Sequence, residues 1–267
     1  MYFKKIIPVK LKDSIKKQLK LSILKRKKYF CPVCNNKIRA FNPISAEYFK
    51  TLDKGGFIHS PFQFETLNLL EYSCPKCGAS DRNRLYALFL SSFIKDFKSD
   101  QIKVLDIAPD DNLRKWLKNK PQISYRSLDL FRKDVDDNCD ITNMNIYNDK
   151  SYDIIICSHV LEHVEDDKKA LCEIHRVLSD KGFAIIMAPV LLTLDHDFEN
   201  PSFKTAIERV KFFGQEDHLR IYSKHGFLNK LQYAGFNVRE LGSGFFGESI
   251  FLQNGISLRS VLYIARK

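Results

Sequence analysis

The sequence lacks any uninterrupted apolar stretch that approaches the roughly 18 residues needed for a membrane-spanning helix. Its lysine-rich start also lacks the apolar core of about 7–15 residues and the small-residue cleavage site of a secretory signal. Internal repeats and low-complexity tracts are not evident either. These absences argue against a membrane-spanning, secreted or repeat protein, and they predict a cytoplasmic chain.

The length and composition are those of a globular protein, with 267 residues of which 44% are hydrophobic and 12% aromatic. Because single domains usually have about 100–200 residues, the chain has room for one α/β domain and a smaller module. We expect three parts: a basic leader at 1–28, a cysteine-bounded segment at 29–80 and a larger domain at 81–267.

Acidic residues are nearly missing from the leader, which has eleven Lys/Arg and one acid and so carries most of the net charge of +11. Apolar residues recur there every four positions, which predicts an amphipathic helix with a cationic face: Ile7, Leu11, Ile15, Leu19 and Ile23. One interpretation is attachment to an anionic membrane surface or to RNA. The other is a helix that packs on its own protein while its lysines are merely solvated.

The seven cysteines are an odd number, and four of them form two Cys-Pro-x-Cys pairs. The pairs are Cys31/Cys34 and Cys74/Cys77, separated by 39 residues. Each pair forms a tight turn that can aim two thiolates at one ion, and four thiolates complete a tetrahedral zinc site. Because such a site has no open coordination position, we expect a structural zinc in a ribbon-like module.

Residues beyond the cysteine segment alternate between strand-like and helix-like patterns. Strands are predicted at 102–107, 123–128, 152–157, 183–188, 236–241 and 258–265, and helices at 113–117, 166–178 and 224–234. Lys181-Gly182 and Gly235 are read as the ends of the second and third helices. This alternation predicts an α/β fold with a mostly parallel, Rossmann-like sheet.

The first strand leads through Ala108-Pro109-Asp110 into a helix, which is where a Rossmann-like sheet places its cofactor loop. Asp129 follows Asp106 by 23 residues and can accept hydrogen bonds from both hydroxyls of a ribose. The loop lacks the glycines that a pyrophosphate needs, which disfavours nicotinamide and flavin cofactors. An acidic loop is better suited to S-adenosylmethionine, whose sulfonium and amino groups are cationic.

From about Lys103 onward the sequence resembles the class I S-adenosylmethionine-dependent methyltransferases. In order, the matching segments are Val104–Asp110, Asp129, Asp140-Ile141, Tyr152–Val164 and Glu173–Pro189. The resemblance is strongest to a bacterial subgroup with a cysteine-rich front and a late segment like Phe213–Tyr222. It implies that the last strand is antiparallel, that Asp129 binds the ribose and that Asp140-Ile141 flanks the adenine.

Within the first motif, Ala108 stands where most of the family has glycine, and Asp106 and Asp110 are the candidates to hold the methionine amino group. Ser158 and His159 follow the next parallel strand and are expected to face the transferred methyl group. His159 is one candidate general base. The other is His218, oriented by Asp217 in the late segment, and the residues alone do not choose between them.

The leading hypothesis is methylation of a small-molecule or glycan-type acceptor, because the chain without its leader is nearly neutral. An RNA methyltransferase that uses the ribbon and leader to bind RNA is the first alternative. A non-catalytic adaptor that has lost the cofactor is the second.

Overall fold

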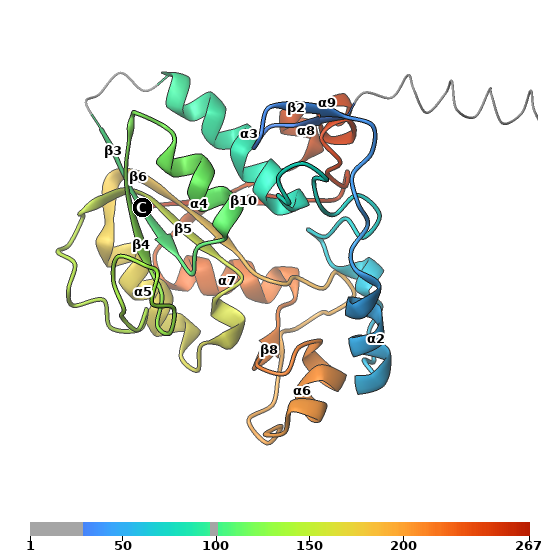
Figure 1. The fold of residues 1–267 in the computed structure, drawn as a ribbon. Helices are drawn as coiled ribbons and strands as arrows, with labels where there is room; N and C mark the ends of the chain where they lie inside the picture. Colours follow the sequence, from blue (N-terminus) through green and yellow to red (C-terminus); the bar gives the residue numbers. More distant parts are fainter. Residues whose placement is uncertain (1–28, 97–100) are drawn as a thin grey trace, which may run out of the picture.

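The computed structural model describes residues 29–96 and 101–267, so the amphipathic helix predicted for the leader lies outside the described residues. A six-stranded sheet forms the centre of the molecule, in the order β4-β3-β5-β6-β10-β9 (Figure 1). Its strands are β3 (Ile102–Ile107), β4 (Ile123–Leu128), β5 (Tyr152–Ser158), β6 (Leu178–Met187), β9 (Asn237–Leu241) and β10 (Leu262–Arg266). The first four pair in parallel, and β10 is antiparallel to both neighbours. The prediction of a mostly parallel sheet with an antiparallel last strand is confirmed.

Helices cover both faces of this sheet, because β3–β4 and β5–β6 step in opposite directions and each crossover is right-handed. One layer holds the contacting helices α3 (Asp81–Asp96) and α4 (Asp111–Lys118). The other holds α5 (Asp167–Val177) and α7 (Lys224–Tyr233). The strands between them are therefore almost continuously buried, as in β5, whose residues Ile154 to Cys157 are at most 1% exposed.

The turn between α5 and β6 differs from the prediction. The helix ends at Val177 and the strand begins at once with Leu178, four residues before the predicted Lys181-Gly182 stop. Leu178 pairs with Tyr152 of β5, so Gly182 lies within the strand. A Cβ on Gly182 would lie 2.5 Å from the carbonyl oxygen of Asp153. This glycine is therefore required by the close approach of two strands and not by a helix cap.

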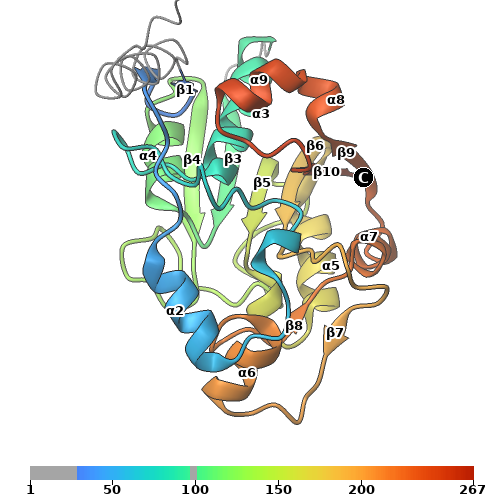
Figure 2. The ribbon, with the colours of Figure 1, turned by 90° about the vertical axis from the view of Figure 1, so that its right-hand side faces the viewer.

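The cysteine-bounded segment folds as a short hairpin, β1 (Tyr29–Cys31) and β2 (Asn36–Ile38), followed by α2 (Ala46–Gly55) and the 3-10 turn η1 (Pro61–Gln63). It then runs along the large domain: Phe64 bridges to Leu191, and the Thr66 hydroxyl exchanges hydrogen bonds with the backbone of Val261. Figure 2 shows α2 beside α6 (Ala206–Phe213), far from the hairpin. Only the cysteine end of the segment is a small module, because the rest packs against the large domain.

The long segment after β6, which shows little periodicity, contains more structure than its sequence suggests. It holds β7 (Phe198–Glu199) and α6, and β8 (Arg220–Ile221) follows it and pairs with β7. Thr205 begins α6 with a capping box that it shares with Glu208. The remaining elements are η2 (Leu161–His163), α8 (Ser243–Phe246) and α9 (Glu248–Gln253). Among the described residues, no helix is both long and apolar enough to cross a membrane.

Candidate functional site

The chain order reverses between β3 and β5, which are neighbours in the sheet although β4 lies between them in the sequence. Ligands of open α/β sheets bind outside the carboxyl ends of the strands at such a switch point. A cavity of about 90 Å³ lies there. From the predicted site it is lined by Asp106, Ala108, Asp110, Ser158 and His159.

The backbone is left-handed at the first turn beyond each of these two strands, with φ of 50° at Ala108 and 57° at His159. Non-glycine residues adopt this conformation at a cost of about 1 kcal/mol or more. Hydrogen bonds hold both turns, because Ala108 N–H donates to Leu128 and His159 N–H to Met187, each at 2.8 Å. The site is thus built from two strained turns that neighbouring strands fix in place.

Asp106 is 2% exposed at the end of β3, and its Oδ2 accepts a hydrogen bond from the Tyr125 hydroxyl at 2.8 Å. Burial raises the pKa of Asp106 to about 7. Asp110 is the N-cap of α4 and accepts hydrogen bonds from the N–H groups of Asn112 and Leu113, and from Asn83 Nδ2 at 2.7 Å. Because Asp110 caps a helix, Asp106 is the predicted acid whose carboxylate is the more available to a ligand.

Asp129 follows β4, and its Oδ1 accepts hydrogen bonds from the N–H groups of Phe131 and Arg132. Its Oδ2 accepts none from residues that the structure describes, which leaves that oxygen available to a ligand. Beside it, the exposed side chains of Leu130 and Phe131 form an apolar surface. This turn offers a carboxylate oxygen next to apolar groups.

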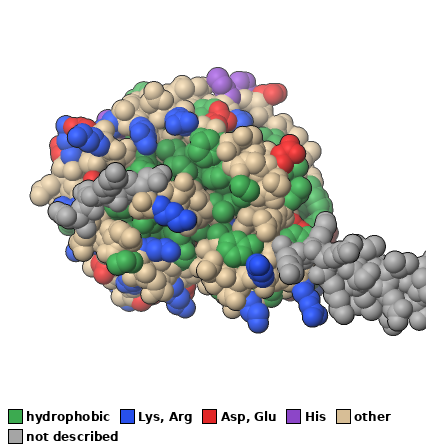
Figure 3. Space-filling model, turned by 90° about the horizontal axis from the view of Figure 1, so that it is seen from above, with side chains coloured by type: hydrophobic (Ala, Val, Ile, Leu, Met, Phe, Trp, Pro, Cys, Tyr) green, Lys and Arg blue, Asp and Glu red, His purple; other side chains and the backbone are tan. Residues whose placement is uncertain are grey.

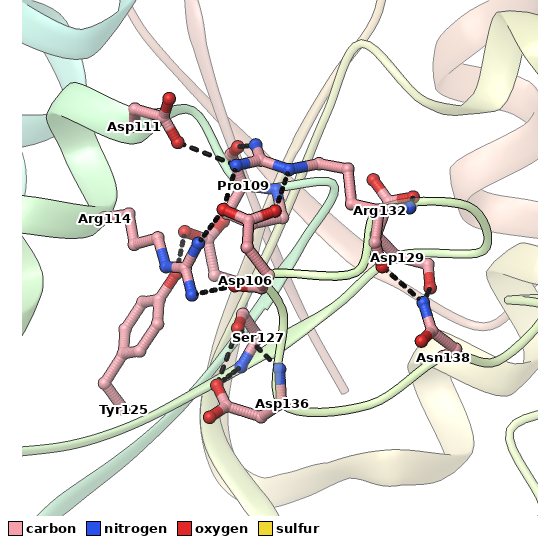
Figure 4. Close-up of polar contacts among 11 residues, drawn as sticks. Asp106, Pro109, Asp111, Arg114, Tyr125, Ser127, Asp129, Arg132, Asp136 and Asn138 are labelled. Carbon is pink, nitrogen blue, oxygen red and sulfur yellow. Dashed lines mark hydrogen bonds and ion pairs between the residues drawn. The ribbon is translucent and has the colours of Figure 1, made fainter.

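Arg132 connects this turn to the loop after β3 (Figure 4). Its guanidinium donates to the Pro109 carbonyl at 2.6 Å and to Asp111 at 2.8 Å, and it also pairs with Asp134 at 2.7 Å. Arg114 of α4 binds the same Asp134. The loops that follow β3 and β4 are therefore held together by ion pairs.

Asp140 and Ile141 do not line the 90 Å³ cavity. The Asp140 side chain is exposed and its Oδ1 accepts a hydrogen bond from the Thr142 N–H, whereas Ile141 is 7% exposed and packs in the main core. Nothing in this arrangement joins the pair to the other predicted site residues.

Ser158 and His159 lie at the carboxyl end of β5. The Ser158 hydroxyl is 2.7 Å from that of Tyr86 in α3. His159 Nδ1 lies 3.2 Å from Glu162 Oε1, and its buried Nε2 has no hydrogen-bond partner among the described residues. Burial, together with the cation of Arg82, lowers the pKa of His159 to about 4. At neutral pH this imidazole is uncharged, and so low a pKa makes it a weak proton acceptor unless the Glu162 carboxylate stabilises its protonated form.

A second cavity, of about 180 Å³, adjoins the first and shares Tyr72, Arg82 and His159 with it. Its other lining residues come from the cysteine-bounded segment, from the loop after β6 and from the end of α6 with the turn that follows it. The apolar ones among them are Ile44, Phe64, Leu67, Val190 and Phe213. His159 therefore stands between a polar cavity and an apolar one.

Asp217 and His218 are adjacent in sequence but do not pair as expected. Asp217, whose side chain is 62% exposed, lies 3.1 Å from Nδ1 of His163. His218 is 3% exposed, and its Nδ1 is 3.1 Å from the carbonyl oxygen of Phe213. His218 lines the second cavity, whereas Asp217 does not. Asp217 therefore has no contact through which it orients His218 as a base.

The four paired cysteines converge at the hairpin, and their sulfur atoms all lie within 4.8 Å of one another. Cys31 Sγ is 3.8 Å from Cys77 Sγ, and Cys34 Sγ is 3.8 Å from Cys74 Sγ. This is near the edge of about 3.8 Å expected for a tetrahedron with zinc–sulfur distances of about 2.3 Å. It is far beyond the roughly 2.05 Å of a disulfide. The donor set and its spacing thus fit one tetrahedral metal ion.

Residues that link this centre to the first cavity are not among those predicted from the sequence. Tyr72, Asn83 and Tyr86 line the first cavity from the cysteine segment and from α3. Their sequence positions carry no motif, because it is the packing of α3 on the sheet that brings them to β3 and β5. A structure was needed to find them.

Comparison with known families fits this geometry. Residues 95–186 match a family model described as "Methyltransferase domain". The matched segment is thus similar to a methyltransferase domain. It runs from the last turn of α3 almost to the end of β6, so it includes both strands whose ends form the first cavity. A comparison with curated proteins found no match.

Solved structures to which the chain is similar include methyltransferases. A SAM-dependent methyltransferase from Archaeoglobus fulgidus has a TM-score of 0.44 at 19% identity, with 72% of this chain and 96% of that chain covered. The CurJ carbon methyltransferase has 0.45 at 15%, with 68% and 53% covered, so the chain spans about half of that protein. The YcgJ protein of Bacillus subtilis has 0.42 at 14%, with 68% and 94% covered.

Proposed function

We propose that this protein is an S-adenosylmethionine-dependent methyltransferase that acts on a hydroxyl group of a small-molecule or glycan-type acceptor. The observation that carries the proposal is the pair of adjoining cavities at the switch point, one polar and one apolar, with His159 between them. A methyl donor in the first cavity and an acceptor in the second would meet at this residue. The match of residues 95–186 to a methyltransferase domain supports the same reaction class.

The residues around the first cavity suit this cofactor, which supplies an electrophilic methyl group on a cationic sulfonium. Asp106 offers a buried carboxylate to the cationic methionine end, and the pairing would favour its ionised form. Asp129 Oδ2 is available to the ribose hydroxyls, and the apolar side chains beside it are available to the adenine. Ala108, Asp110 and Ser158 shape the cavity wall, and Asp140-Ile141 remain assigned to the adenine by resemblance alone.

Calorimetric titration with S-adenosylmethionine tests the cofactor. Wild-type protein is expected to bind in the micromolar range, and Asp129→Ala to bind about 10–100-fold more weakly, because charge-assisted hydrogen bonds contribute about 1.5–3 kcal/mol each. Asp53→Ala, which removes an exposed acid of α2 that lines neither cavity, is the matched comparison. If folded wild-type protein did not bind, the enzyme would be excluded and the non-catalytic adaptor favoured.

We assign the general base to His159 rather than to Asp217 and His218. Its Nε2 is unpartnered, its imidazole is neutral at pH 7, and its Nδ1 faces the Glu162 carboxylate. A carboxylate in this position holds the ring and stabilises the imidazolium that forms when Nε2 takes a hydroxyl proton. His218 has no free nitrogen directed at the acceptor cavity that would give it the same role, because its unpartnered Nε2 faces Glu162.

Replacing His159 with Gln is expected to lower kcat about 100-fold, at the lower end of the range for loss of a general base, with little change in cofactor affinity. The readout is methyl transfer from labelled S-adenosylmethionine to a panel of hydroxylated small molecules and glycans. His225→Gln, an exposed histidine of α7, controls for loss of an imidazole. Equal loss in binding and turnover would mean that His159 is a packing residue.

We also propose that the Cys31, Cys34, Cys74 and Cys77 thiolates hold a structural zinc ion. Their spacing fits a closed tetrahedral site, and Cys31 and Cys74 are at most 2% exposed. The neighbouring core is small and consists of Ile38, Phe41 and Ala79, so a metal would supply cohesion that this part of the chain otherwise lacks.

RNA is the second candidate acceptor, and a groove beside the cysteines favours it. The groove, of about 980 Å³, lies between the hairpin, α3 and α4, and it carries four lysines: Lys76, Lys95, Lys115 and Lys120. Lysine and arginine side chains also stand around apolar ones on the upper face of the molecule (Figure 3). Including RNA in the acceptor panel decides between the candidates, since transfer to RNA would fall steeply with salt.

A further inference from the structure

Behind the acceptor cavity lies a cluster of metal-ligating side chains that is separate from the cysteines. Glu162 and His163 belong to the 3-10 turn η2, and His218 comes from the segment before β8. One ligand atom from each of the three lies within 4.8 Å of the other two. The rings of His163 and His218 meet edge to face, with their centroids 4.7 Å apart. The fold thus brings together three donors from two segments that lie more than 50 residues apart.

Two polar atoms at the centre of this cluster have no partner among the described residues. Glu162 is fully buried; its Oε2 accepts no hydrogen bond from the part of the chain that the structure describes, and its Oε1 faces His159 Nδ1 at 3.2 Å. Nε2 of His218, which is 3% exposed, is also unpartnered and lies 4.0 Å from Glu162 Oε1. A buried carboxylate with so few donors is costly, on the order of several kcal/mol, unless a cation is present.

The other nitrogen of each histidine is already held. Nδ1 of His218 lies 3.1 Å from the Phe213 carbonyl oxygen, and Nδ1 of His163 lies 3.1 Å from Asp217 Oδ2. An Nδ1–H that donates to a carbonyl or a carboxylate leaves Nε2 with its lone pair free. This is the outer-shell arrangement of metal-binding histidines, in which the second nitrogen fixes the ring and its tautomer.

We propose that Glu162, His163 and His218 form a second metal site, which binds a first-row divalent cation such as Zn²⁺ or Co²⁺. Two imidazoles and one carboxylate are the donors that these ions accept, and three protein ligands leave a coordination position open. Thiolates are absent from the set, which separates it from the cysteine site. The His163 side chain is 31% exposed, so solvent reaches the cluster and an ion has a path to enter.

The position of the cluster indicates what an ion would do there. His218 lines the acceptor cavity, and Glu162 also contacts His159. An ion at this site would fix the segment that carries His218 against η2, and would place a positive charge at the wall of the acceptor cavity. Acceptors that present an oxygen anion or a chelating pair of hydroxyls are the class that such a wall favours.

Cobalt binding by the full chain tests the site, after one equivalent of zinc has been added to metal-free protein so that only the four-cysteine site is filled, because Co²⁺ reports its ligands by absorption. Wild-type protein is expected to retain one Co²⁺ per chain after gel filtration, with d–d bands but no thiolate-to-cobalt charge-transfer band. Glu162→Gln and His218→Ala are expected to retain less than a tenth of that amount. His225→Ala, on the exposed face of α7, is expected to retain the wild-type amount.

A second variant avoids the core. Asp217→Asn changes only a largely exposed group, and loss of this outer-shell carboxylate is expected to weaken Co²⁺ binding about tenfold or more. The proposal is overturned if wild-type protein retains no Co²⁺, if the bound Co²⁺ shows the thiolate band, or if Glu162→Gln and Asp217→Asn bind it as tightly as wild type. None of these readouts requires methyl transfer, so they are independent of the proposed enzyme activity.

Discussion

Serine at both Cys31 and Cys74 is expected to abolish zinc binding at the hairpin and to lower the melting temperature by about 10 °C. Structural zinc contributes about 10–16 kcal/mol to folding in isolated zinc fingers. A loss of only about 3 kcal/mol in the free energy of unfolding would lower the melting temperature by this amount in a domain of this size. Elemental analysis of the purified protein and thermal unfolding followed by circular dichroism provide the two measurements.

The expected loss extends beyond the hairpin, because α3 begins four residues after Cys77 and carries Asn83 and Tyr86 into the first cavity. Weaker binding of S-adenosylmethionine should therefore accompany the loss of metal. Cys172→Ser is the matched control, since Cys172 is exposed on α5 and lies apart from the other cysteines. Unchanged metal content and unchanged melting temperature in the double variant would contradict a structural zinc.

Methionine in place of Arg84 is expected to destabilise the protein by about 3–5 kcal/mol, the range found when one partner of a buried charged network is removed. Arg84 is fully buried, and its guanidinium lies 3.8 Å from the centre of the Phe41 ring. It donates to five backbone carbonyls, those of Glu71, Tyr72, Ala79, Asn254 and Gly255. Methionine fills a similar volume but removes the donor to all five; Ala79 and Gly255 also accept from Cys74 N–H and Asn68 Nδ2, whereas Glu71, Tyr72 and Asn254 lose the side-chain donor that Arg84 supplies.

Urea unfolding measures this effect, with Arg239→Met as the control because Arg239 lies exposed on β9. The control is expected to change the free energy of unfolding by less than about 0.5 kcal/mol. Arg84→Lys should also be destabilised, since one ammonium group cannot reach carbonyls on three separate segments. A change below about 1 kcal/mol in Arg84→Met would show that the carbonyls find other donors and that Arg84 does not join these segments.

The strands and the two cysteine turns could be predicted from the sequence, because both depend on local patterns. A buried β-branched run such as Tyr152–Cys157 predicts a strand whatever follows it, and two Cys-Pro-x-Cys turns each place two thiolates on one side of a tight turn. The alternation of strands and helices then implied a parallel sheet. Because parallel strands all end at the same edge of such a sheet, it also implied that Asp106 and His159 lie at that edge. The prediction was wrong at Gly182, which was assigned to the end of a helix. This glycine is needed instead because a neighbouring strand approaches it closely.

Only the tertiary structure determined which side chains meet. Asp217 and His218 are adjacent in sequence, yet one contacts His163 and the other faces Glu162, because adjacent side chains at this bend point in different directions. Tyr86 reaches Ser158, and Arg84 reaches Gly255, across 72 and 171 residues. Such contacts produce no periodic pattern in the sequence. Whether two distant residues meet depends on how all the elements between these residues pack. The sequence by itself determined the sheet, the two cysteine turns and the edge that holds the candidate site, whereas packing decided the hydrogen-bond donors, the cavities and the meeting of Glu162 with His218.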